Sequence, residues 1–89
     1  MRQNPEFIIT DVGKDHILVP VGRTAVNFNA VITLNDMGRD IWALLEKDMS
    51  EDELVKSILQ EYDVSEEQAR ADLRSFLRKL QDSGCIIED

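Results

Sequence analysis

The chain has 89 residues, of which 43% are hydrophobic and 31% are charged, and its formal net charge is −8 at pH 7. This length predicts one domain over residues 1–89, with a modest core and no room for a deep cleft between two subdomains. The acidic balance argues against nucleic-acid binding, because that affinity comes mainly from Lys and Arg side chains that neutralise phosphates.

Signals of location are few. The first residues, Met1–Pro5, carry no apolar stretch behind a basic head, so we expect no secretory signal. The apolar runs are far shorter than the ~20 residues that span a bilayer, which argues against a membrane protein. Cys85 is the only cysteine and cannot form an internal disulfide. We therefore infer a cytoplasmic location, where thiols stay reduced.

The first third of the chain is typical of β-strands. Residues 1–6 are expected to be a loose lead-in, followed by strands at Phe7–Val12 and His16–Val21. Thr24–Leu34 then alternates between apolar and polar residues, as a half-buried strand does. This third strand lacks the charge or proline that usually protects a sheet edge, so it is either an unprotected edge or a central strand.

Three helices are predicted after the strands, and each has a start signal. Asn35 can cap the first helix, Asp36–Glu46, with its side-chain oxygen. Ser50 and Ser65 each begin a capping box, and Gly84 can end the third helix in a left-handed conformation. The sequence therefore predicts an α+β fold with a three-stranded antiparallel sheet followed by three helices.

Trp42 brings the largest apolar side chain to the first helix, beside a stripe of apolar residues at helical spacing. We interpret it as a core anchor that joins the sheet to the helices. The alternative is a partner contact, because Trp is enriched at interface hot spots. The apolar tail Ile86–Ile87 is expected either to pack back on the core or to form a short strand.

No arrangement of residues predicts catalysis, a metal site or a cofactor. The chain has a single His16 and a single Cys85, and a small, partly buried residue is the simpler interpretation of that cysteine. The four glycines are scattered, so no phosphate-binding loop is predicted. The acidic run Asp48–Glu53 lacks the spacing and glycine of a calcium loop. We predict a protein that is not an enzyme.

Two features favour peptide binding instead. The third strand, if it lies at the sheet edge, can pair with an extended peptide. Arg70, Arg74 and Arg78 recur every four residues beside Leu73 and Leu77, so an adjoining groove would be apolar with a basic rim. The alternative is pairing within the helix, for example between Glu66 and Arg70, which contributes little.

The order of these segments resembles the PqqD-like family. Leu34-Asn35 through Ile41-Trp42-Ala43-Leu44-Leu45 is similar to its "LN…IW-LL" signature, and the later helices continue the pattern. The resemblance spans about Val26–Ile87 and implies a winged-helix-like fold. Lys47-Asp48 departs from it, because a glycine commonly follows the first helix in the family.

The resemblance implies a non-catalytic peptide chaperone. Such proteins hold the leader segment of a ribosomally made precursor peptide and deliver it to a modifying enzyme, often a radical S-adenosylmethionine protein. The leader would add beside the third strand, in a groove shared with the third helix. The implied peptide-binding residues are Ala25, Val26, Asn27, Phe28, Asn29, Ala30, Val31 and Ile32 on the strand, and Arg70, Leu73, Arg74, Leu77 and Arg78 on the helix.

Several alternatives stay open at this point. The product can be pyrroloquinoline quinone or another modified peptide, and the protein can be a monomer or a homodimer. A winged-helix DNA-binding protein has a similar topology, although the net charge of −8 argues against it. A purely structural subunit of an enzyme complex would lack the peptide groove.

Overall fold

The computed structural model describes residues 1–22 and 31–88. Among these residues, strands come first, three helices follow, and a short strand comes last, which confirms the predicted α+β class. The winged-helix likeness stays a prediction. In chain order the elements are β1 (Arg2–Gln3), β2 (Phe7–Val12), β3 (Asp15–Pro20), β4 (Ile32–Leu34), α2 (Asp36–Leu44), α3 (Glu51–Glu61), α4 (Glu66–Asp82) and β5 (Ile86–Ile87).

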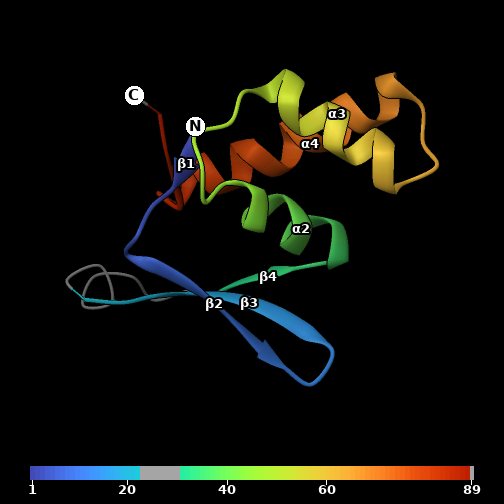
Figure 1. Ribbon diagram of the computed structural model, residues 1–89. Helices are drawn as coiled ribbons and strands as arrows, with labels where there is room; N and C mark the ends of the chain where they lie inside the picture. The colour runs from blue at the N-terminus through green and yellow to red at the C-terminus, as the bar shows by residue number, and fades with distance from the viewer. Residues whose placement is uncertain (23–30, 89) are drawn as a thin grey trace.

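The main sheet lies on one side of α2, and the α3–α4 pair lies on the other (Figure 1). Its strands are antiparallel in the order β2-β3-β4, which confirms the predicted three-stranded sheet. The register of β4 against β3 runs from Ile32 opposite Leu18 to Leu34 opposite His16. Of the predicted strand Thr24–Leu34, the structure describes only residues 31–34. Val31 lies outside β4, and residues 24–30 lie outside the described residues.

The amino terminus is tied to the rest of the fold, which corrects the expectation of a loose lead-in over residues 1–6. β1 pairs antiparallel with β5, with Arg2 opposite Ile87, so the tail forms the short strand that was one of its two expected states. The terminal ammonium donates to Asp48 Oδ1 at 2.7 Å, and the backbone N–H of Gln3 donates to the carbonyl of Leu45 at 2.8 Å. These contacts join segments far apart in the chain.

The first two helices begin where the sequence predicts. The side-chain oxygen of Asn35 accepts from the N–H of Gly38 at 2.7 Å, and α2 ends at Leu44, two residues before the predicted Glu46. At the start of α3 the capping box is complete. The N–H of Glu53 donates to the Ser50 hydroxyl at 3.2 Å, and the N–H of Ser50 donates to the Glu53 carboxylate at 3.1 Å.

The start of α4 is capped on one side only. The Ser65 hydroxyl accepts from the N–H of Gln68 at 3.1 Å, as a capping box requires. The side chain of Gln68 does not return to Ser65; it donates to Asp72 Oδ1 at 2.8 Å, one turn further on. After α4 ends, Gly84 has a φ of 77°, which confirms the predicted left-handed position.

The core lies between α2, the sheet and the α3–α4 pair. Trp42 is 3% exposed, which confirms its interpretation as a core residue. None of the helices in residues 1–22 and 31–88 has the length and apolar character of a membrane span. The buried hydrophobic residues are Phe7, Leu18, Ile32, Leu34, Ile41, Trp42, Leu45, Leu54, Val55, Ile58, Ala69, Leu73, Leu77, Leu80, Cys85 and Ile86.

Candidate functional site

β4 is an edge strand of the described sheet, because β3 pairs with one side of it and no described strand pairs with the other. Its side chains alternate: Ile32 and Leu34 are buried, while Thr33 is exposed. A free edge presents backbone N–H and C=O groups to which an extended peptide can add. Among the described strands, Ile32–Leu34 therefore corresponds to the edge alternative.

Two hollows adjoin the end of β4, where the chain enters α2. One has a volume of about 550 Å³ and involves the β3–β4 end of the sheet and α4, and the other, of about 430 Å³, lies between α2 and α4. They share Asn35, Phe76 and Lys79, so they meet at Phe76. The first is further lined by residues 14–16, 33, 34 and 36, and the second by Met37, Gly38, Ile41, Asp72 and Ser75.

Phe76 reaches this position because α2 has a glycine opposite it. A Cβ atom at residue 38 would lie 3.0 Å from Cε1 of Phe76 and 3.3 Å from Cβ of Leu34, closer than ordinary contact. Gly38 thus allows the ring to approach the start of α2. The partly buried ring offers an apolar surface between the two hollows, of the kind that binds apolar or aromatic side chains.

The predicted helix residues lie elsewhere on α4. Leu73 and Leu77 are 0% and 5% exposed, so they belong to the core and do not form groove walls. Arg78 is exposed. None of the predicted positions Arg70, Leu73, Arg74, Leu77 and Arg78 lines either of the two hollows beside β4.

Arg70 and Arg74 point toward α3. Arg70 donates to Glu51 Oε2 at 2.7 Å and to Asp52 Oδ1 at 2.9 Å, and Arg74 Nε donates to Glu51 Oε1 at 2.9 Å. Arg74 and Arg70 together hold the pKa of Glu51 below its usual value. The expected pair within the helix, Arg70 with Glu66, is longer at 3.9 Å. These two arginines join the two helices and do not form the rim beside β4.

The helix side of the hollows consists of residues that the sequence analysis did not assign to a site. Asp72, Ser75, Phe76 and Lys79 recur at the spacing of one helix face, next to the buried stripe. The sequence contains one indication of this site, because Phe76 is the only aromatic residue of the helix and lies at the border of the buried stripe. Among the predicted strand residues, Val31 is 60% exposed and Ile32 is 6% exposed, whereas Ala25–Ala30 lie outside the described residues.

His16 lies beside the first hollow and links the sheet to α2. Its Nδ1 is 2.7 Å from Asp11 Oδ1, and its Nε2 is 2.9 Å from Asp36 Oδ1. Hydrogen bonds to Asp11 and Asp36 raise the pKa of His16, since both carboxylates favour the imidazolium that can donate from both nitrogens. The charged form thus holds the β2–β3 hairpin against the first turn of α2.

Cys85 is fully buried, and burial raises the pKa of its thiol to about 11. A nucleophilic cysteine needs the opposite shift, which a neighbouring base or cation supplies. Both ring nitrogens of His16, the single histidine of the chain, already face carboxylates. The two residues are therefore not arranged as a nucleophile and its base.

The chain is similar to known proteins in both sequence and fold. The family model of coenzyme PQQ synthesis protein D (PqqD) matches residues 15–86. The structure described as "TbiB1 in Complex with the TbiA(beta) Leader Peptide" has 26% identity and a TM-score of 0.78, with 100% of both chains covered.

A second structure, "Lasso peptide synthetase B1 complexed with the leader peptide", shares the fold. It has 22% identity and a TM-score of 0.75, with 98% of this chain and 96% of that chain covered. No curated protein matches the chain in sequence. The family match extends from β3 to β5 and includes the edge strand and all three helices. The chain therefore belongs to the PqqD family.

Proposed function

We propose that this protein is a non-catalytic adaptor, which binds the leader segment of a ribosomally synthesised precursor peptide and presents it to a modifying enzyme. The observation that carries this proposal is the free edge of β4 beside the hollows at Phe76. It is supported by a protein of the same fold and 26% identity whose structure is a complex with a leader peptide.

In this proposal the leader adds to β4 as a further strand. Backbone hydrogen bonds to Ile32–Leu34 set its register, and alternate side chains enter the hollows beside Phe76. The predicted peptide contacts Ala25–Ala30 lie outside the described residues and stay part of the proposal. Lys14 and Lys79 line the hollows together with Asp15, Asp36 and Asp72, so charged leader residues would pair locally. With a net charge of −8, long-range attraction of an acidic leader is not expected.

Two classes of product are compatible with this proposal. The family name points to pyrroloquinoline quinone synthesis, whereas one solved relative of the fold is a lasso peptide synthetase component. A radical S-adenosylmethionine protein is one enzyme that could receive the peptide. A short precursor reading frame beside the gene would identify both the leader and the product. The cytoplasmic location inferred from the single cysteine stays a prediction.

Titration of that leader into isotope-labelled protein tests the proposal. Amide shifts should concentrate on residues 31–36 and 72–79, where the edge of β4 and the two hollows meet. A scrambled leader of the same composition is the control and should leave these amides unmoved. Shifts that concentrate on α3 or on Phe7–Val12 would contradict the docking position, and equal binding of the scrambled peptide would contradict leader recognition.

A further inference from the structure

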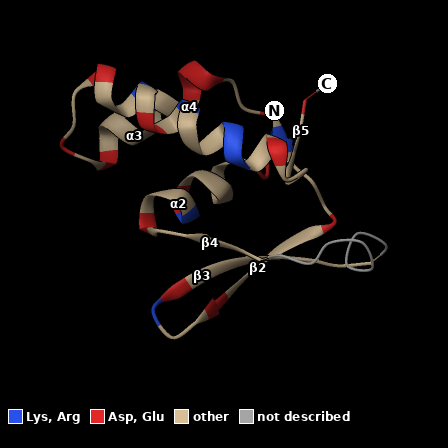
Figure 2. Cartoon of the chain, turned by 180° about the vertical axis from the view of Figure 1, so that it is seen from behind, with Lys and Arg blue, Asp and Glu red and all other residues tan. Residues whose placement is uncertain are grey.

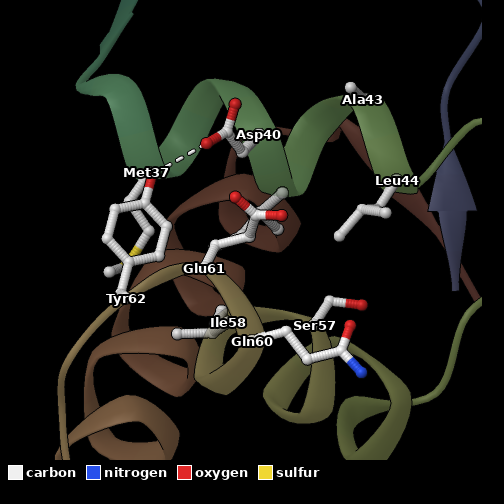
Figure 3. A pocket seen from close by; sticks show the side chains of 10 residues that line it. Met37, Asp40, Ala43, Leu44, Ser57, Ile58, Gln60, Glu61 and Tyr62 are labelled. Carbon is white, nitrogen blue, oxygen red and sulfur yellow. Dashed lines mark hydrogen bonds between the residues drawn. The ribbon is translucent and has the colours of Figure 1, made fainter.

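A third hollow, of about 470 Å³, lies between α2 and α3 (Figure 3). Met37, Ile41 and Leu44 from α2 face Ile58 from α3, so its lining is mainly apolar. Neither Phe76 nor any residue of β4 lines it. This α2–α3 hollow is therefore distinct from the proposed leader site, although Met37 and Ile41 also border the hollow between α2 and α4.

The charged residues that line the α2–α3 hollow are both acidic in the described part of the chain. Asp40 comes from α2 and Glu61 from the end of α3, and both are exposed. The hydroxyl of Tyr62 donates to Asp40 Oδ2 at 2.7 Å. Acidic positions lie on both α2 and α3 (Figure 2). The apolar lining thus has a negative rim.

The titration of Tyr62 reflects the same negative field. The hydrogen bond to Asp40 is the largest cause that raises the pKa of Tyr62 to about 12, and burial is the second. The nearby charges of Asp40, Asp36 and Glu61 act in the same direction. A cation placed at this rim would be attracted by several carboxylates. The net charge of −8 adds long-range attraction for a basic partner.

We propose that the α2–α3 hollow binds an amphipathic segment of a partner protein, in which apolar side chains are flanked by Lys or Arg. A groove between two helices accepts the apolar face of such a segment. Met37 suits it, because an unbranched thioether adapts to different apolar side chains. The volume falls in the range of ~300–1,000 Å³ that is common for ligand sites. The basic flanks would pair with Asp40 and Glu61.

This surface goes beyond leader binding, and its role as the contact to a receiving protein rests on the proposed adaptor function. An adaptor that delivers a peptide needs to contact the receiving protein while the peptide stays bound. The α2–α3 hollow would serve that need, because it leaves the outer edge of β4 and Phe76 free.

The test uses a designed amphipathic Leu/Lys peptide as the probe and a Leu/Glu peptide of the same pattern as its control. The Leu/Lys peptide should shift the amides of residues 37–44 and 57–62, and the Leu/Glu peptide should not. The variant with both Asp40→Asn and Glu61→Gln removes the acidic rim, while the new amide oxygen at position 40 still accepts from Tyr62. Affinity for the Leu/Lys peptide should fall about three- to tenfold.

A matched variant with Glu67→Gln and Asp82→Asn removes two carboxylates outside the hollow, at exposed positions of α4. Its affinity should stay within about twofold of the unchanged protein, since distant exposed charges are screened. The proposal is overturned if both double variants weaken binding equally, if the Leu/Glu peptide binds as well, or if the shifts fall on residues 31–36. Leader titration of the Asp40→Asn, Glu61→Gln protein keeps the two proposals separate, because leader affinity should not change.

Discussion

The two sides of α4 carry similar kinds of residues but have different surroundings. On one side Arg70 and Arg74 are paired with Glu51 and Asp52 of α3. On the other side Phe76 and Lys79 line the hollows beside β4, and Lys79 forms no ion pair with any residue that the structure describes. The comparison shows that basic residues next to an apolar stripe do not by themselves mark a binding face. The neighbouring helix decides whether they are already satisfied.

Trp42→Ala should have the strongest effect, because it removes a large buried side chain from the core next to which α4 packs. The side chain is 3% exposed, so its loss should cost about 3–5 kcal/mol of unfolding free energy. Small domains have total stabilities of only ~5–15 kcal/mol, so this variant should lose a large part of its stability. Urea unfolding measures the change. A stable Trp42→Ala protein that lost only binding would mean that Trp42 contacts a partner.

Phe76→Ala should distinguish the two sides most directly. Removing the ring between the hollows should weaken leader binding by roughly tenfold or more, as expected for an aromatic anchor. Calorimetric titration with the leader measures it. Leu59→Ala is the matched control, because Leu59 is an apolar residue of α3, 37% exposed, that lines none of the three hollows. Similar losses in both variants would place the peptide elsewhere.

The variant with Arg70→Gln and Arg74→Gln tests the opposite side. It should lower the melting temperature slightly, and less at high salt, because exposed ion pairs contribute little and are screened. Leader affinity should not change. The folded-state pKa of Glu51 is lowered, so the stability from this network is present above the usual carboxyl pKa and is lost as the pH falls through the lowered value. Weakened leader binding would return the arginines to the peptide site that the sequence predicts.

A weaker effect is the pH dependence of stability that His16 should cause. Its pKa is raised in the fold by hydrogen bonds to Asp11 and Asp36, while desolvation and the charge of Arg39 act in the opposite direction. The resulting stability is therefore fully present below the ordinary histidine pKa of about 6.5, and it is lost as the pH rises through the raised value. Proton NMR of the ring should give a midpoint above about 6.5, and Asp11→Asn should lower it. An unshifted midpoint would mean that the bridge to α2 does not form.

The helices and their order could be read from local patterns in the sequence. Helix caps such as Asn35 to Gly38 and Ser50 to Glu53 join residues only three positions apart, so a short stretch of sequence is enough to predict them. The burial of Trp42 followed from the apolar stripe beside it, since helical periodicity is also local. The family was recognisable for the same reason, because its signature is a string of such local signals around α2.

The position of the candidate site, in contrast, depends on contacts between distant parts of the chain. The pairing of β1 with β5, the edge position of β4 and the ion pairs between α3 and α4 all join residues distant in sequence. Gln68 completes no capping box because Asp72 offers its side chain another acceptor. Phe76 has the same apolar character as its buried neighbours, and only the space left by Gly38 brings it to the hollows. Local patterns predict which face of a helix is buried, whereas packing determines which part of its border stays open to a ligand.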